Sequence, residues 1–374
     1  MTIGFVLDSD IDHPGGVQRF VKGLYKFVTQ QGHHAVIFTG GAKGESEQLG
    51  FKVCRLGRVK NLPGNDAEIS VFADWVEEAD IKFLLKDEGV DLLHIQGVFG
   101  LLGIRFLDVG QLPSVGTFHN FWEPERLPQV FRLSFPIFGH YVGKMKIKIA
   151  DSTAARELMQ RIAPGDYYII PPGINVERFR LARGKRFFPK SWVQIVYVGR
   201  LDKRKGLMHL LRAFLKVKSE VDEAGLLVVG KGSLRDEAEE FVRRNHLEDV
   251  CFTGYVPDDE LPSYYRGSDI FCSPAVHGEC FGIVLVEAMA ANLPIVAFDN
   301  AGYRDVLTGE GRRFLVESGN VDRLALALIQ LCRDSDLRRR MSEWGRREVE
   351  QYDWNVVGQK YLEIYKRLIT EGKE

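Results

Sequence analysis

Short β-branched or apolar segments alternate with longer segments of helical periodicity, and this alternation restricts the possible folds more than any other feature. The first cycle places a strand at 3–7, a helix at 17–31 and a second strand at 35–39. Units of this βαβ kind build a parallel sheet with helices on its faces. Further strands are expected at 52–55, 92–96, 114–118, 146–150 and 167–170, and helices at 71–86, 101–109, 130–142 and 154–162. The fold class is therefore α/β.

The alternation is interrupted once and then starts again. Pro171, Pro172 and Gly173 precede a stretch of little periodicity, 175–190, and such punctuation marks a linker. A strand at 193–198 opens a second series, and 374 residues exceed what one hydrophobic core usually supports. We expect two doubly wound, Rossmann-like domains, 1–172 and 173–354, facing each other across a cleft, with the C-terminal segment 355–374 packing back on the first domain.

The segment 277–290 combines a polar turn with a largely apolar helix. Glu279 lies in the turn, a helix is expected from Phe281 onward, and Glu287 lies within that helix. A helix N-terminus offers backbone N–H groups to phosphate, and carboxylates accept hydrogen bonds from hydroxyl groups. A ligand with both phosphates and hydroxyls would suit this arrangement. The alternative is an ordinary helix start whose single glutamate is paired within the protein.

Two candidates in the first half follow expected strands, where open parallel sheets bind ligands. Gly15 and Gly16 lie between the first strand and the first helix, and a glycine pair lets the backbone approach an anion. A tight turn explains them equally well, and the full dinucleotide pattern is absent. His119 follows the strand 114–118 and could contact a substrate or act as an acid or base, but a structural role is the alternative.

Two more candidates follow strands of the second half. Arg200 and Lys205 lie in one loop after the strand 193–198, and together they suit a diphosphate leaving group. The backbone at Val256, after another strand, could contact the edge of a base. The alternatives are a solvated charged turn and a strand end with Asp258 as a helix cap.

The region 126–148 interleaves aromatic and aliphatic residues with cations. This composition suits peripheral contact with a membrane or a lipid-facing groove, although a core helix with cationic ends is the alternative. No apolar run is long enough to span a bilayer.

Composition narrows the remaining classes of function. Lys plus Arg (50) balances Asp plus Glu (51), so no nucleic-acid partner is expected. The five cysteines are odd in number and lack metal-ligand spacing, which favours a reducing, cytoplasmic location and no tightly bound metal. The serine hydrolase elbow and the phosphate loop of nucleotide triphosphatases are both missing.

Taken together, the motifs resemble those of the family 4 retaining glycosyltransferases, which have the GT-B fold of two Rossmann-like domains. The resemblance covers nearly the whole chain and is closest to the phosphatidylinositol mannosyltransferases. The residues that carry it are Gly15, Gly16, His119, Gly199, Arg200, Lys205, Gly206, Glu279 and Glu287.

The resemblance implies a role for each candidate. Arg200 and Lys205 would hold the diphosphate of a nucleotide sugar, with Gly16 close to the same group. Glu279 would bind hydroxyls of the donor sugar, and Phe281, Gly282 and Ile283 would donate backbone N–H groups beside it. Glu287 would bind the ribose, and Val256 would contact the base. His119 would contact the sugar or the charge that develops on it.

The implied reaction is retaining transfer of a hexose, without a metal or other cofactor, from GDP-mannose to a lipid-linked or glycan acceptor. A transferase that uses UDP-glucose or UDP-galactose, a nucleotide-sugar epimerase and a non-catalytic binding protein are the alternatives. The enzyme would be cytoplasmic or peripheral at the inner face of the cell membrane. Two features depart from the lipid-modifying relatives: the stretch 74–91 is acidic rather than basic, and Asp8 and Asp10 add negative charge before Gly15.

Overall fold

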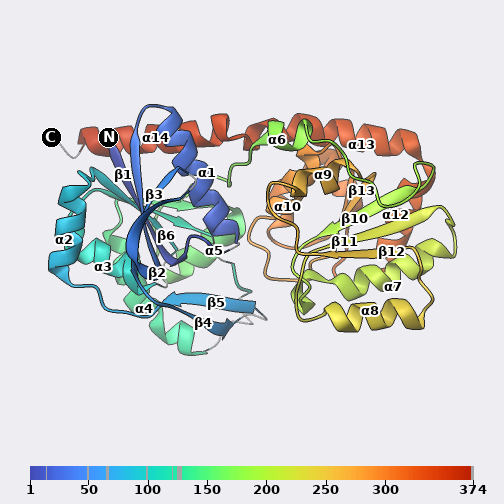
Figure 1. The fold of residues 1–374 in the computed structure, drawn as a ribbon, viewed down its shortest axis with the longest axis horizontal. Coiled ribbons are helices and arrows are strands. Elements are labelled where there is room, and N and C mark those ends of the chain that lie inside the picture. Colours follow the sequence, from blue (N-terminus) through green and yellow to red (C-terminus); the bar gives the residue numbers. More distant parts are fainter. Residues whose placement is uncertain are drawn as a thin grey trace. The chain divides into compact units, whose positions relative to one another are not determined.

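A computed structural model describes residues 1–13, 15–48, 50–64, 67–97, 100–119, 121–123 and 129–371. The chain divides into two compact units (Figure 1). Unit 1 comprises Met1–Gly173 together with the C-terminal segment that begins at Trp354, and unit 2 comprises Ile174–Asp353. Each unit is built around its own sheet and is described separately.

Unit 1 contains a seven-stranded sheet of order β3-β2-β1-β6-β7-β8-β9. All neighbouring strands pair in parallel except β2 and β3. The order reverses between β1 and β6, so the carboxyl ends of these two strands flank a switch point. The bounds are β1 (Thr2–Asp10), β2 (His34–Gln48), β3 (Phe51–Gly57), β6 (Leu92–Gln96), β7 (Ser114–Phe118), β8 (Ile147–Ala150) and β9 (Tyr168–Ile169).

Helices cover both faces of this sheet. One face carries α1 (Gly16–Gln30) and α14 (Trp354–Glu371), whose core includes Phe5, Leu24 and Tyr361. The other face carries α2 (Glu78–Asp87), α3 (Leu101–Gly110), α4 (Gln129–Lys144) and α5 (Thr153–Ile162). Helix α14 is anchored by the hydroxyl of Tyr365, which lies 2.6 Å from Nδ1 of the buried His94.

The helix expected at 71–86 is wrong in its first half, because α2 begins only at Glu78. Residues Ala67–Phe72 form β5, which pairs antiparallel with β4 (Val59–Gly64). The alternation of polar and β-branched or aromatic residues in β5 has the period of a strand rather than that of a helix.

Unit 2 contains a six-stranded parallel sheet of order β12-β11-β10-β13-β14-β15. Its strands are β10 (Val193–Val198), β11 (Ala224–Val229), β12 (Val250–Gly254), β13 (Ile270–Ser273), β14 (Ile295–Phe298) and β15 (Leu315–Val316). Its helices are α6 (Val176–Arg180), η2 (Lys203–Lys205), α7 (Leu207–Lys218), α8 (Arg235–Arg244), α9 (Leu261–Arg266), α10 (Ile283–Ala290), α11 (Tyr303–Val306), η3 (Gly309–Phe314), α12 (Val321–Arg333), α13 (Ser335–Glu348) and η4 (Val349–Tyr352).

Both sheets confirm the predicted α/β class of two doubly wound, Rossmann-like units. In unit 2 the order reverses between β10 and β13, so the loops after these strands emerge side by side. These are the loops that contain Arg200, Lys205 and Glu279.

Candidate functional site

The loops after β10 and β13 are joined by a buried ion pair. Nζ of Lys205 lies 2.5 Å from Oε1 of Glu279, and the two side chains are only 19% and 8% exposed. Lys205 ends the short helix η2, and Asp202 caps this helix by accepting a hydrogen bond from the Lys205 N–H at 3.0 Å. Gly206 follows with φ +72°, and a Cβ there would lie 1.9 Å from the carbonyl oxygen of Pro274. Only glycine lets the two loops approach this closely.

Arg204 connects the same loops through both its backbone and its side chain. The N–H of Val276 donates to the carbonyl oxygen of Arg204 at 2.9 Å. Nη1 of Arg204 donates to the carbonyl oxygen of Gly278, also at 2.9 Å. Sequence reasoning missed Arg204, although it is directly adjacent to Lys205. The contact that distinguishes it comes from a loop far away along the chain.

The electrostatics of this cluster favour an ionised Glu279. Burial by itself would raise the pKa of this carboxyl, but Lys205, Arg204 and Arg200 together lower it below its ordinary value. A buried carboxylate that remains charged at neutral pH is a strong acceptor of hydrogen bonds from hydroxyl groups.

Arg200 occupies the exposed side of the same loop. Its side chain is 50% exposed, and Nη2 lies 3.5 Å from Oδ2 of Asp202. Its carbonyl oxygen accepts a hydrogen bond of 2.9 Å from the hydroxyl of the buried Tyr197, which fixes the backbone beneath it. The guanidinium can therefore reach a ligand without disturbing the core.

The helix of the 277–290 segment begins later than predicted. Helix α10 starts at Ile283, because Gly282 is its N-cap and has φ +95°, a left-handed conformation that cannot be helical. A Cβ at Gly282 would lie 2.6 Å from the ring of Tyr303. Phe281 is buried and packs its ring near that of Tyr352, 5.6 Å between centroids. The first-turn N–H groups of a helix have no partner within the helix, so this end suits an anion.

Glu287 lies in the interior of unit 2. Leu285, Ala288 and Met289 of α10 are fully buried, and Glu287 is nearly so. The carboxylate accepts a hydrogen bond of 2.9 Å from the hydroxyl of Tyr265. Tyr265 was not singled out in the sequence, since nothing in its local pattern distinguishes it from an ordinary core aromatic residue.

Val256 lies after β12, two strands from β10 along the same edge of the sheet. Its side chain is buried, whereas its neighbour Tyr255 is exposed. Nζ of Lys231 lies 5.2 Å from the centroid of the Tyr255 ring, which supports that ring from one side. The loop thus exposes the ring of Tyr255, which Lys231 contacts, next to the backbone of Val256.

In unit 1, Gly15 and Gly16 form the start of α1. Gly15 is the N-cap, and a Cβ at Gly16 would meet nothing within 4 Å. Nε2 of Gln18 donates to Oγ of Ser9 at 2.8 Å and closes the turn against the end of β1. The space above Gly16 is compatible with close approach of a ligand. Pro14, the first residue of the motif, lies outside the described residues.

His119 lies at the carboxyl end of β7, between the ends of two neighbouring strands. Its Nε2 is 2.8 Å from Oε1 of Gln96 at the end of β6, and its Nδ1 is 3.3 Å from Oδ2 of Asp151, just after β8. Its ring packs against Phe20, with 4.7 Å between centroids. Both ring nitrogens thus contact protein groups. The sequence did not lead us to Gln96 or Asp151, although both residues lie at the carboxyl ends of predicted strands, where ligand-binding residues are expected.

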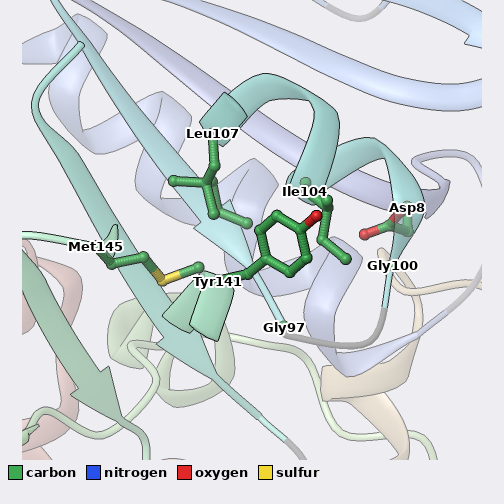
Figure 2. A pocket seen from close by; sticks show the side chains of 9 residues that line it. Asp8, Gly97, Gly100, Ile104, Leu107, Tyr141 and Met145 are labelled. Carbon is green, nitrogen blue, oxygen red and sulfur yellow. The ribbon is translucent and has the colours of Figure 1, made fainter. Parts of the chain in front are cut away.

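A small hollow opens at the switch point of unit 1 (Figure 2). Asp8 lies on one side of it and accepts a hydrogen bond from the N–H of Leu102 at 2.8 Å, which caps α3. Burial raises the pKa of Asp8 to about 6, although N–H groups of Leu102 and Gly103 oppose the rise. Figure 2 shows Tyr141 and Met145 extending from the other side toward α3. Asp8, one of the two acidic residues that precede Gly15 in the sequence, thus caps the N-terminus of α3.

Two further observations concern the described residues only. Nowhere in these ranges do three or more His, Cys, Asp or Glu side chains gather as a metal site would require. Likewise, none of the described helices has both the length and the apolar character needed to cross a bilayer.

Comparison with known proteins places this geometry in a family. The family model described as "Glycosyltransferase Family 4" matches residues 14–178, and the model described as "Glycosyl transferases group 1" matches residues 179–348. A phosphatidyl-myo-inositol mannosyltransferase of Mycobacterium leprae is 31% identical over 379 residues, which cover 100% of this chain and 99% of the relative. The chain belongs to the family 4 glycosyltransferases.

A second relative of this family 4 glycosyltransferase matches only part of its length. It is a GDP-mannose-dependent alpha-(1-6)-phosphatidylinositol monomannoside mannosyltransferase of Mycobacterium tuberculosis, 31% identical over 209 residues, 52% of this chain and 54% of the relative.

Solved structures show that the family 4 glycosyltransferase has the GT-B fold. A sucrose-phosphate synthase from Thermosynechococcus elongatus aligns with a TM-score of 0.79 at 19% identity, covering 99% of both chains. Anabaena HepE in complex with UDP and glucose aligns with a TM-score of 0.75 at 19% identity, covering 98% of this chain and 100% of the other.

Proposed function

We propose that this glycosyltransferase moves a mannose residue from GDP-mannose to a lipid-linked or glycan acceptor, with retention of the anomeric configuration and without a metal ion. The observation that carries the proposal is the ionised Glu279, paired with Lys205 at 2.5 Å and surrounded by Arg204 and Arg200. One carboxylate and three cations in adjoining strand-end loops match a ligand with hydroxyls at one end and a diphosphate at the other.

In this proposal the cations stabilise the leaving group. The bond between the anomeric carbon and the phosphate oxygen breaks, and negative charge grows on the diphosphate. Lys205 is shared between Glu279 and that charge, while the exposed Arg200 approaches it from the other side. The N–H groups of Phe281, Gly282 and Ile283 add donors from the start of α10. Preorganised positive charge of this kind can supply the stabilisation that a metal ion gives in other transferases.

Recognition of the donor uses the remaining residues of unit 2. Glu279 accepts hydrogen bonds from hydroxyls of the hexose, and Glu287, oriented by Tyr265, contacts the ribose. The base lies against the backbone of Val256. In unit 1 we assign the diphosphate to Gly16, at the start of α1, and the sugar to His119.

Retention follows if the acceptor attacks from the face that the phosphate leaves. The acceptor oxygen then bonds to the anomeric carbon, and its proton passes to an oxygen of the departing phosphate. This route needs no protein nucleophile. It requires the charge on the phosphate to be held in place, which is the task proposed for Arg200 and Lys205.

The names of both relatives favour mannose and a phosphatidylinositol-type acceptor, and the name of the Mycobacterium tuberculosis relative also specifies GDP-mannose. The Anabaena structure with UDP and glucose keeps a UDP-sugar donor as the second candidate. Calorimetry with GDP and UDP distinguishes them, since the difference lies in the base pocket near Val256. For a phosphatidylinositol-type acceptor, we propose that the enzyme works as a cytoplasmic protein at the inner face of the membrane.

The proposal is tested by incubating the protein with GDP-mannose, UDP-glucose and a lipid extract, then analysing products by mass spectrometry and the new linkage by NMR. Arg200→Ala should weaken GDP binding about 10- to 100-fold, because a charged hydrogen bond to phosphate is lost. Arg340→Ala, in the exposed face of α13, is the matched control and should have no effect. Unchanged binding and transfer in both Arg200→Ala and Glu279→Gln would sink the assignment. Isomerised donor without transfer would instead indicate an epimerase.

A further inference from the structure

The ring of His119 is enclosed from three directions. Its side chain is only 8% exposed, and so is little of Asp151, whose Oδ2 lies 3.3 Å from Nδ1 of the ring. Oε1 of Gln96 lies 2.8 Å from Nε2. The buried ring of Phe20 packs on the imidazole, with 4.7 Å between centroids. Any rotation of the imidazole would break these contacts, so its orientation is fixed by the fold.

Asp151 lies where a helix cap would be expected, but another residue is the cap. It follows β8 and precedes α5, a common place for an N-cap carboxylate. The N-cap of α5 is Ser152, whose Oγ accepts a hydrogen bond of 3.0 Å from the N–H of Ala155. The carboxylate of Asp151 faces His119 instead. Helix capping therefore does not explain a buried carboxylate at this position.

The groups around the ring decide which nitrogen carries a proton. A carboxylate only accepts hydrogen bonds, so Nδ1 of His119 must donate to Asp151. Gln96 presents its amide oxygen to Nε2, and with this oxygen as acceptor the ring donates twice, as the imidazolium. If the amide rotates and presents its nitrogen, the ring is neutral and accepts at Nε2. In both arrangements the proton on Nδ1 faces Asp151.

Rotation of the Gln96 amide would break no other hydrogen bond of its nitrogen. Nε2 of Gln96 is buried, and within the part of the chain that the structure describes it has no hydrogen-bond partner. A buried amide nitrogen without a partner is unfavourable. Turning this nitrogen toward a neutral His119 would satisfy it. Gln96 can therefore serve the ring in either charge state.

His94, on the neighbouring strand β6, has a different environment. Its Nε2 lies 2.7 Å from the hydroxyl of Thr117, and its Nδ1 lies 2.6 Å from that of Tyr365. A hydroxyl can donate or accept, so neither partner fixes the proton on one nitrogen. Burial, with a smaller contribution from His119, lowers the pKa of His94 well below its ordinary value. Of these two histidines, His119 is the one whose ring lies beside a carboxylate.

We infer that Asp151 is a positioning residue that fixes a proton on Nδ1 of His119. The inference rests on the proposed function, in which His119 contacts the sugar. Because Asp151 holds the ring at Nδ1, Nε2 is the nitrogen that can gain or lose a proton, and the amide of Gln96 turns to follow this change. Nε2 can then exchange Gln96 for an oxygen of the sugar while the bond to Asp151 stays in place.

NMR of the full chain with nitrogen-15-labelled histidine measures the position of the proton directly. At about pH 8, where a histidine of ordinary pKa is neutral, couplings between ring protons and ring nitrogens distinguish a proton on Nδ1 from one on Nε2. The signals of His119 are identified by their absence from the spectrum of His119→Gln. We expect Nδ1 to be protonated in the wild type. A neutral ring with its proton on Nε2 would overturn the inference.

The variant Asp151→Asn removes the charge and keeps the shape of the side chain. An amide can donate to Nδ1, so the proton of the neutral ring should move to Nε2. The kcat for transfer from GDP-mannose should fall about 10- to 100-fold, because a hydrogen bond to a charged group is lost. KM for the donor should change by less than about twofold, since its proposed contacts lie mainly in unit 2. Glu157→Gln, which removes an exposed carboxylate from α5, is the matched control and should change neither quantity.

Three results with the variants would contradict a positioning role. These are a proton that remains on Nδ1 in Asp151→Asn, a kcat that does not fall in it, and an equal fall in Glu157→Gln. If Asp151→Asn does not fold, Gln96→Met replaces it, because Asp151 should still hold the proton on Nδ1 when no polar group faces Nε2. A proton on Nε2 in Gln96→Met would refute the inference. The proposed function fails separately, since a wild type that binds no GDP in calorimetry would refute that function whatever the NMR spectrum shows.

Discussion

The pair of Lys205 and Glu279 allows a prediction that depends on both burial and charge. Replacing Lys205 by Met keeps a long side chain but leaves the carboxylate of Glu279 without its nearest cation. Removal of one partner from a buried ion pair costs about 3–5 kcal/mol. Lys205 is 19% exposed, and Arg204 and Arg200 remain nearby, so we expect the lower end, about 3 kcal/mol. For a unit of this size that loss lowers Tm by roughly 6–12 °C.

The loss should depend on pH in a defined direction. In the wild type the folded-state pKa of Glu279 lies below the ordinary value of 4.5, so the pair stabilises the fold above that pH and ceases to do so as the pH falls through the lowered pKa. Without Lys205, burial raises the pKa, so the folded state is destabilised above the raised pKa and recovers on acidification. The difference between the two proteins is therefore largest near neutral pH and shrinks toward about pH 4.

Thermal melts of the wild type and Lys205→Met across this pH range measure the effect. Lys203→Met, in the exposed part of the same short helix, is the control and should melt with the wild type at every pH. Combining Lys205→Met with Glu279→Gln should recover most of the lost stability and remove the pH dependence, because no buried charge remains. A loss in Lys205→Met that is the same at all pH values would refute the electrostatic reasoning and leave packing as the cause.

Three further substitutions test other parts of the structure. Gly282→Ala should destabilise unit 2 by at least about 1–2 kcal/mol in urea unfolding, because φ is +95° and the ring of Tyr303 would lie 2.6 Å from the new Cβ; an unchanged midpoint would contradict the left-handed cap. Tyr265→Phe should cost about 1–3 kcal/mol by removing the hydrogen bond to the buried Glu287, and urea unfolding with no such loss would show that this bond is not needed. Asp8→Asn should stabilise the protein above about pH 6, and the gain should vanish near pH 4, because the raised pKa of Asp8 makes the wild type less stable as the pH rises; melts with the opposite slope would refute this.

Local pattern predicted most strands well. Leu92–Gln96, Ser114–Phe118 and Val193–Val198 have the predicted bounds, because each is a short, largely apolar run ended by a polar residue or glycine. The paired strands β4 and β5 were missed, and the helix expected at 71–86 overlapped the end of β5, although the alternation in Ala67–Phe72 has the period of a strand. The start of α10 was wrong by two residues because the conformation of Gly282 is imposed by Tyr303, which lies in a different loop.

The candidate site shows the same division between local and distant information. The rule that ligands bind at strand ends assigns Lys205 and Glu279 to the same edge of the sheet, and the two side chains indeed form an ion pair there. The rule could not distinguish Arg204 from its neighbours in the same loop, nor identify Tyr265, because their partners lie on other elements. Asp151 does follow a strand end, and it was overlooked. A single sequence contains the polar groups of such a site but does not show which of them are paired.

The path of the chain has a consequence for the order of folding. Unit 2 is one continuous segment, Ile174–Asp353, so it can complete its core as soon as it leaves the ribosome. Unit 1 is not continuous, because α14 supplies Val357, Tyr361 and Tyr365 to the core above Phe5. During synthesis, the face of the unit 1 sheet that α14 covers therefore remains exposed until the segment after Asp353 has been synthesised. Unit 1 is synthesised first but completes its folding last, and a chaperone would be needed at its exposed apolar face.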